Sequence, residues 1–362
     1  MTYSGQNRMS LNRAVPLSPP LRLESIEKIA VFRALQIGDM LCAVPALRAL
    51  RAAFPHAHVT LVGLPWATQF ARRFRAYIDD FAAFPGHPAL PEQPAQEERI
   101  PGFYRDMRER RFDLALQMHG SGQISNTIVR GFGARENAGF VLAEDDAPRS
   151  ELFVDYPESG AEPLRLLRLP QHLGAPADDA DLEFPLAPED EQELRATGIG
   201  AGLQAGRYIC IHPGARMRRR CWPPQLFAQV ADTLAREYDM PIVLTGAGSE
   251  ADLTAAIAAC MRTPAVDAAL SMSIGAMAAL MSKTSLLICN DTGVSHIASG
   301  LKLPSVVVFG TADMERWGPL DRVRHRCVRG ADGAEAILSQ ARSLLDATGQ
   351  RLDAAAIPGP VQ

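Results

Sequence analysis

The sequence is poor in aromatic residues and has no strong excess of charge. Aromatics make up 6% of its 362 residues, and the formal net charge is -4. A nucleic-acid-binding protein usually carries a basic face or stacking aromatics, so the composition argues against nucleic acid as a partner. No run reaches the roughly 18 apolar residues of a membrane span, which leaves only peripheral membrane contact.

Cysteine pairs with redox or metal-binding spacing are also missing. The six cysteines include no CxxC pair, and most lie in apolar runs such as YICIHPGA and LLICND. Buried, reduced thiols in a cytoplasmic setting are the simplest interpretation. The first 24 residues lack the apolar region of a signal peptide, so we interpret 1–24 as a disordered or loosely ordered tail.

Short apolar runs alternate with longer amphipathic ones along the chain. This pattern predicts repeated β-α units and an α/β fold with parallel sheets. The expected strands are 28–33, 58–63, 113–119, 207–215, 241–246, 286–291 and 305–310. The expected helices are 39–53, 66–75, 123–131, 162–174, 223–238, 249–261, 273–284, 293–300 and 332–347.

The periodicity weakens between residues 155 and 206, where proline, glycine and acidic residues gather. We therefore expect two domains joined by a linker. The predicted segments are an N-terminal domain over 25–185, the linker over 186–206, a second domain over 207–330, and a C-terminal helix and tail over 331–362. Two doubly wound halves would place a ligand cleft between the carboxyl ends of their sheets.

Four motifs put glycine and polar residues at expected strand ends: GD at 38–39, HPGA at 212–215, TGAGSE at 245–250 and NDTGVSHIA at 290–298. None matches GxGxxG or GxxxxGK[ST], so a dinucleotide or P-loop site has no support. A single glycine turn of this kind is common in any α/β fold. Three of them lie in the second half, however, and should meet at one edge of its sheet.

The DTG motif carries the most specific chemistry. Thr292 and Gly293 would expose backbone N–H groups at a helix start, which favours an anion such as a diphosphate. Asp291 can be an N-cap or a ligand contact. His296 can be a core residue or a contact, and we favour the contact. Asp39 poses the same question, because it can cap the helix that follows or face a substrate as a base.

Two further groups of charged residues remain open to two interpretations. Arg216, Arg218, Arg219 and Arg220 can form a solvated basic loop, or they can pair with phosphate oxygens. Glu250 can complete a capping box at its own helix, or it can accept hydrogen bonds from ribose hydroxyls.

Taken together, IGDMLCAVPALRALRAAFP, HPGA…RCWPP, VLTGAGSE and CNDTGVSHIASGLKLPSVVVFG resemble glycosyltransferase family 9, the ADP-heptose:lipopolysaccharide heptosyltransferases. The resemblance spans residues 28 to about 320. It implies the GT-B fold and an inverting, metal-independent transfer, with an acceptor in the N-terminal domain and a nucleotide sugar in the second. The absence of a DxD motif or of a cluster of metal ligands agrees with this implication, and we expect no metal and no cofactor.

The resemblance also implies roles for individual residues. Asp39 becomes the general base, Thr292 and Gly293 contact the diphosphate, and Glu250 contacts the ribose. Arg220 stands where the family usually has a lysine. The planar guanidinium of arginine thus takes the place of an ammonium, which acts as a point charge. The implied donor contacts are Gly214, Ala215, Arg220, Glu250, Asp291, Thr292, Gly293 and His296. The implied acceptor contacts are His119, Gln123 and Asn126.

The partners expected from this resemblance are ADP-heptose and a glycolipid or saccharide acceptor. Peripheral contact with the cytoplasmic face of the inner membrane stays open, since the basic stretch ARRFRAY can meet an anionic lipid or be a solvated helix face. Three alternatives also stay open: another nucleotide sugar, an acceptor outside lipopolysaccharide, and a nucleotide-sugar binder or epimerase on the same scaffold.

Overall fold

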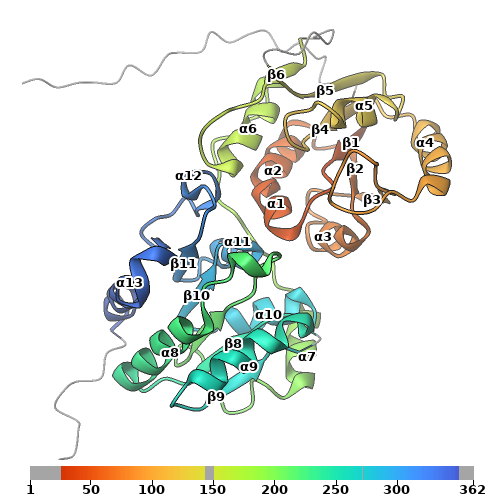
Figure 1. Cartoon of the computed structure of the whole chain (residues 1–362). Coiled ribbons are helices and arrows are strands. Elements are labelled where there is room, and N and C mark those ends of the chain that lie inside the picture. The colour runs from red at the N-terminus through yellow and green to blue at the C-terminus, as the bar shows by residue number, and fades with distance from the viewer. Residues whose placement is uncertain (1–25, 143–150, 271, 350–362) are drawn as a thin grey trace, which may run out of the picture.

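Two parallel β-sheets, one in each half of the chain, form the framework of the protein (Figure 1). The structure is a computed structural model that describes residues 26–142, 151–270 and 272–349, so the predicted tail 1–24 lies outside the described residues. The sheets have the strand orders β3-β2-β1-β4-β5-β6 and β12-β11-β10-β7-β8-β9. Both orders are the doubly wound arrangement 3-2-1-4-5-6. The predicted α/β class with two doubly wound halves is confirmed.

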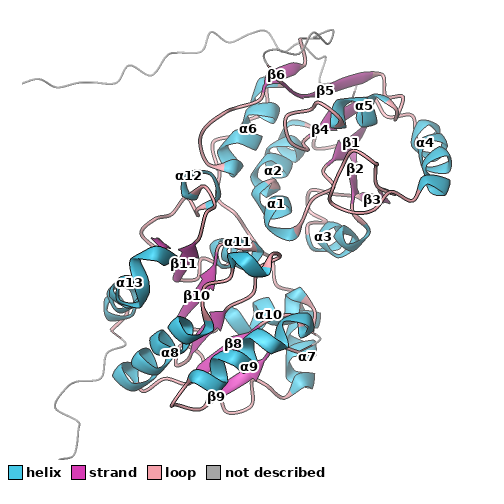
Figure 2. Cartoon of the chain, viewed as in Figure 1, coloured by secondary structure: helices cyan, strands magenta, loops and turns pink. Residues whose placement is uncertain are grey.

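The described helices and strands alternate as the sequence predicts (Figure 2). The first half contains β1 (Lys28–Phe32), α1 (Ile37–Cys42), α2 (Val44–Ala53), β2 (His58–Gly63), α3 (Thr68–Arg73), β3 (Asp80–Ala83), α4 (Ile100–Glu109), β4 (Leu114–Gln117), α5 (Ser125–Arg130), β5 (Glu136–Val141), β6 (Phe153–Asp155) and α6 (Glu162–His172). The second half contains α7 (Pro188–Thr197), β7 (Ile209–His212), α8 (Pro224–Tyr238), β8 (Ile242–Thr245), α9 (Ala251–Cys260), β9 (Ala265–Ala268), α10 (Ile274–Met281), β10 (Leu286–Asn290), α11 (Gly293–Gly300), β11 (Ser305–Phe309), α12 (Met314–Trp317), β12 (His325–Arg329) and α13 (Gly333–Ala347).

The central strands are short apolar runs that the helices cover on both faces. Every residue of β4, β7, β8, β10 and β11 is buried. Val, Ile and Leu suit such strands, because a parallel sheet has no face left for water. The rigid sheets hold the loops at their carboxyl ends in place, and those loops carry the predicted motifs.

The structure differs from the sequence prediction at several helices and strands, and it contains α4, α7 and α12, which were not predicted. The single helix expected over 39–53 is two helices, α1 and α2, which meet at Ala43. Pro45, in the first turn of α2, has no N–H to continue the ladder of α1. The strands β3, β6, β9 and β12 were not predicted. They are the edges of the two sheets and are only partly buried, so their apolar pattern is weak.

The segment 186–206, predicted as the linker, contains α7, which packs against α10 of the second half. The domain boundaries themselves stay a prediction.

The two halves meet through short helices at the carboxyl ends of their sheets. The start of α1 packs against the start of α11, and α12 of the second half approaches α6 of the first (Figure 1). Glycines permit the first of these contacts. A Cβ on Gly293 would lie 2.6 Å from Ile37 Cγ2, and a Cβ on Gly38 would lie 3.1 Å from Gly293 Cα. The GD and DTG motifs therefore meet in space.

Candidate active site

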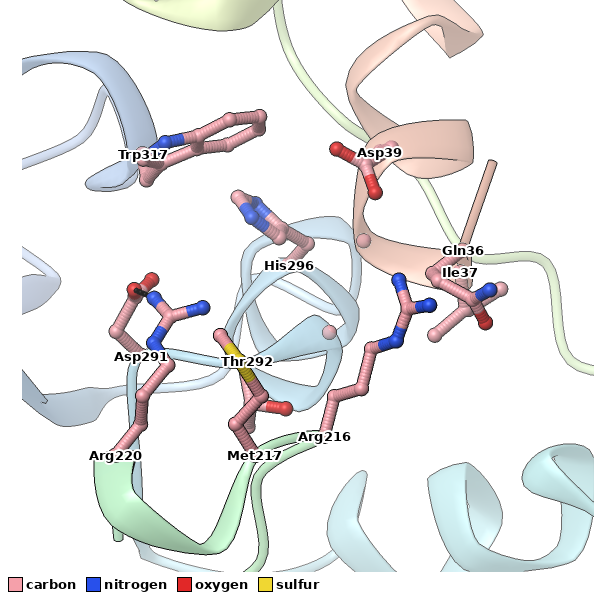
Figure 3. Close-up of a pocket in the computed structure, with 12 residues that line it drawn as sticks. Gln36, Ile37, Asp39, Arg216, Met217, Arg220, Asp291, Thr292, His296 and Trp317 are labelled. Atoms are coloured by element: carbon pink, nitrogen blue, oxygen red, sulfur yellow. Dashed lines mark hydrogen bonds and ion pairs between the residues drawn. The ribbon is translucent and has the colours of Figure 1, made fainter. Parts of the chain in front are cut away.

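A cavity of about 550 Å³ lies between the two halves (Figure 3). This volume is in the usual range for a small-molecule site. Its position at the carboxyl ends of β1, β7 and β10 is where ligands bind in doubly wound sheets. The residues that line it are Gln36, Ile37, Gly38 and Asp39 from the first half, and Arg216, Met217, Arg220, Asp291, Thr292, Gly293, His296 and Trp317 from the second.

Asp39 lies in the first turn of α1 and lines the cavity. Gln36 occupies the N-cap position, and no side chain caps this helix, so the N-cap interpretation of Asp39 is wrong. Burial raises the pKa of the Asp39 carboxyl above its ordinary value, although the Arg33 guanidinium acts in the opposite direction. A carboxylate with a raised pKa binds a proton more strongly, which suits a general base near neutral pH.

Asp291 and Arg220 form an ion pair at the other side of the cavity. Arg220 Nη2 lies 2.6 Å from Asp291 Oδ2, and Asp291 is 8% exposed. Burial raises the pKa of Asp291 to about 6, while Arg220 lowers it. Asp291 precedes α11, whose N-cap is Thr292, so its side chain is not the cap and is paired with a cation instead.

The start of α11 faces the cavity with Thr292 and Gly293. Backbone N–H groups at such a start are suited to an anion. His296, one turn further on, is 5% exposed, and its Nδ1 lies 3.8 Å from the thiol of Cys42 on α1. Burial lowers the pKa of His296 to about 4, so the ring is neutral at pH 7. The ring lines the cavity and packs against the first half, and its contact with a ligand stays a prediction.

Six lining residues are absent from the contacts that the resemblance implies: Gln36, Ile37, Gly38, Arg216, Met217 and Trp317. Figure 3 shows Asp39 and Trp317 at one side of the cavity, with Arg216, Met217 and Arg220 at the other. Among the four arginines of the HPGA loop, only Arg216 and Arg220 line the cavity. Trp317 lies on α12, several residues after the end of β11, and no motif of the sequence analysis pointed to it.

Glu250, Gly214 and Ala215 are not among the residues that line the cavity. Glu250 Oε2 accepts a hydrogen bond from the Ala247 N–H at 2.8 Å, so the capping interpretation is correct at this helix start. A Cβ on Gly214 would lie 2.0 Å from Glu250 Oε1, which means that the HPGA turn fits over this carboxylate only with glycine. Contact between Glu250 and a ribose stays a prediction.

The three residues predicted for the acceptor do not line the cavity. His119 is 7% exposed, and its Nδ1 accepts from the Ala34 N–H at 3.2 Å. Asn126 is also buried, and its Nδ2 donates to the Phe140 carbonyl at 2.9 Å. Gln123 is exposed on the loop before α5. His119 and Asn126 thus hold the local fold, and an acceptor contact from any of the three stays a prediction.

Neither a metal cluster nor a membrane-spanning helix appears in the described part of the chain. Residues 26–142, 151–270 and 272–349 contain no group of three or more His, Cys, Asp or Glu side chains that could hold a metal ion. In the same residues, no helix combines the length and the apolar character that crossing a membrane requires.

Comparison with known proteins agrees with this geometry. The family model "Glycosyltransferase family 9 (heptosyltransferase)" matches residues 102–344. Lipopolysaccharide heptosyltransferase 2 of Escherichia coli (strain K12) is 25% identical over 350 residues, which cover 90% of this chain and 96% of that protein. Lipopolysaccharide heptosyltransferase 3 of the same strain is 30% identical over 131 residues, but these cover only 35% of this chain and 36% of that protein.

A solved structure shows the same fold. It is that of E. coli ADP-heptose lps heptosyltransferase II, with a TM-score of 0.71 and 18% identity, over 89% of this chain and 99% of that one. The predicted GT-B arrangement of two Rossmann-like halves around a cleft is confirmed.

Proposed function

This chain belongs to glycosyltransferase family 9 and is a glycosyltransferase, and from that premise we propose that it transfers heptose from ADP-heptose to a hydroxyl of a lipopolysaccharide-core acceptor, with inversion. The observation that carries the proposal is one cavity that holds an acid from the first half and cationic, anion-binding groups from the second. The names of the similar heptosyltransferases support the choice of donor and acceptor.

In the proposed reaction, the second half holds the nucleotide. The Thr292 and Gly293 N–H groups and the guanidinium of Arg216 face the diphosphate, while the Arg220–Asp291 pair and His296 line the donor pocket. We further propose that Glu250 contacts the ribose across the HPGA turn, near Gly214 and Ala215.

Asp39 then acts on the acceptor. Its carboxylate takes the proton of the acceptor hydroxyl as the oxygen attacks the anomeric carbon from the face opposite the diphosphate. The bond between that carbon and the diphosphate oxygen breaks, ADP leaves, and the configuration at the anomeric carbon inverts. Base catalysis of this kind contributes about 10²–10⁴-fold to the rate. The proposal needs no metal, because cationic side chains and N–H groups can stabilise the leaving diphosphate.

The acceptor in this proposal is carried on a lipid, so we also propose peripheral contact with the cytoplasmic face of the inner membrane. The exposed arginines Arg72 and Arg75, at and after the end of α3, offer positive charge to anionic lipid. Co-sedimentation with vesicles, with and without anionic lipid, tests this contact: binding that requires anionic lipid supports it, and no binding contradicts it.

A donor screen tests the proposed function. The protein is incubated with ADP-heptose, UDP-sugars or GDP-sugars, together with a heptose-deficient lipopolysaccharide core, and the product is analysed by mass. Heptose added only from ADP-heptose supports the proposal. Transfer from another nucleotide sugar would show that the fold is right and the donor is wrong. Nucleotide-sugar binding without any transfer or hydrolysis would indicate a binder.

A further inference from the structure

A buried carboxylate at the start of α6 joins the two halves beside the cavity. Glu162 is 4% exposed and pairs with three arginines: Arg33 and Arg165 from its own half, and Arg316 from the other half. Arg33, directly after β1, has its Nη2 3.7 Å from Glu162 Oε1. Arg316, on α12, donates from Nε to Glu162 Oε2 at 2.9 Å. A buried carboxylate normally has such cationic partners, because an unpaired charge would be costly.

Arg33 connects this carboxylate to the helix that carries Asp39. Its Nε and Nη2 donate to the Asp39 backbone carbonyl at 3.0 and 2.7 Å, and its Nη1 donates to the Met118 carbonyl. Arg33 is 1% exposed, so its guanidinium has little freedom to move. The first turn of α1 is therefore fixed to the ends of β1 and β4 through this one side chain.

Arg316 connects the same carboxylate to the part of the cavity wall that Trp317 forms. Its Nη2 donates to the hydroxyl of Tyr156, a residue of the first half, at 3.0 Å. The guanidinium carbon also stands 4.6 Å from the ring centre of Trp317, which lines the cavity. The packing of α12 against α6 thus determines where Trp317 lies in the cavity wall. It also places the positive charge of Arg316 beside Glu162.

We propose that Glu162 is a positioning residue: it joins Arg33 and Arg316 into an ion network across the two halves that sets the orientation and the charge state of Asp39. This inference rests on the base role proposed for Asp39. It adds that the orientation and charge state of this base depend on the contact between α6 and α12.

The charges around Asp39 shift its pKa in opposite directions, which makes the network testable. Burial raises the pKa of Asp39 most, Glu162 raises it further, and Arg33 and Arg316 lower it. The titratable and charged groups near Asp39 are Arg33, Cys42, Arg216, Glu162, Asp291, His296 and Arg316. Removing the negative charge of Glu162 should lower the pKa of Asp39, and removing the positive charge of Arg316 should raise it. A change that only loosens the fold has no reason to produce opposite shifts.

The test is a ¹³C NMR titration of the aspartate carboxyls in the full, ligand-free chain, with the Asp39 signal assigned by Asp39→Asn. We expect the Asp39 pKa to move down by at least about 0.3 in Glu162→Gln and up by at least as much in Arg316→Gln. The matched control is Asp190→Asn, which breaks the Arg73–Asp190 pair, also between the halves, at 2.6 Å. This control should leave the Asp39 signal unchanged.

The acid limb of the pH profile of kcat/KM should move in the same two directions. If Glu162→Gln does not fold, because it leaves Arg33 buried without its partner, the upward shift in Arg316→Gln decides alone. The network would be overturned if the Asp39 pKa did not move in either variant. It would also be overturned if the pKa moved in the same direction in both variants and Asp190→Asn reproduced that shift. Opposite NMR shifts in a protein without transferase activity would support the network and refute the proposed function.

Discussion

At the scale of single residues, the arginines of the HPGA loop have different partners. Arg218 pairs with Asp252 at 2.7 Å, and Arg220 pairs with Asp291 at 2.6 Å. Arg216 lines the cavity and forms no ion pair with a residue in the described ranges. Of the two arginines of this loop that line the cavity, Arg216 is thus the one without an ion pair among the described residues, although the family resemblance pointed to Arg220.

We predict that Arg216→Gln weakens ADP binding by about tenfold or more, because a charge-assisted hydrogen bond is lost. Isothermal titration with ADP measures the change in Kd. The control is Arg219→Gln, which removes the same charge from the same loop at a position that does not line the cavity. Equal losses in the two variants would mean that Arg216 acts only through the net charge of the loop.

At the scale of secondary-structure elements, the close approach of α1 and α11 depends on glycine. Gly293 begins α11, and its position leaves no room for a Cβ against Ile37. Because Ile37 and Gly38 precede Asp39 in the same helical turn, any displacement of α11 also changes the distance from the base to the anion site.

We therefore predict that Gly293→Ala lowers kcat/KM by about tenfold or more, since displacements near 1 Å at a reacting centre have effects of that size or larger. Steady-state kinetics measures it. Gly200→Ala is the control, because a Cβ at Gly200 meets nothing within 4 Å. Full activity in Gly293→Ala would show that the two helices can separate without consequence.

The edge strand β12 carries another buried histidine, His325. His325 is 1% exposed, and its Nδ1 lies 2.8 Å from the Ser305 hydroxyl of β11. Burial lowers the pKa of His325 to about 4. The unfolded chain binds this proton near pH 6.5, so the folded state loses stability as the pH falls from about 6.5 toward 4.

We predict that His325→Asn removes part of this loss. Between pH 7 and pH 5, the free energy of unfolding should fall by roughly 2 kcal/mol less in the variant than in the wild type. Urea denaturation at both pH values measures the difference. Asp291, whose pKa is raised to about 6, titrates in the same window with the opposite sign, but it does so equally in both proteins. Parallel pH dependence in the two proteins would contradict the assignment.

At the scale of the whole molecule, the sequence predicted the features that arise locally. Buried strands such as β1 and β10 are apolar runs, and the motifs that follow them lie at the carboxyl ends that build the cavity. Asp39, Asp291, Thr292, Gly293 and His296 were found in this way. The doubly wound topology then brings them to one site.

The remainder of the site depends on contacts between distant parts of the chain. Glu162 and Arg316 are 154 residues apart, and neither stands in a motif. The edge strands are half exposed and carry little apolar pattern. The acceptor predictions relied on a segment beside β4, where His119 and Asn126 form hydrogen bonds with backbone groups. Sequence pattern alone does not distinguish such a structural role from a ligand contact.

The central claim is that Asp39 is the base in a transfer that takes place between the two halves. The most direct measurement is the kcat of ADP-heptose turnover, together with the donor Kd, for the wild type and for Asp39→Asn. We predict that the variant binds the donor within about twofold of the wild type and loses about 10²–10⁴-fold in kcat. Equal turnover in the two proteins would contradict the account, because Asp39 would then have no part in the chemistry.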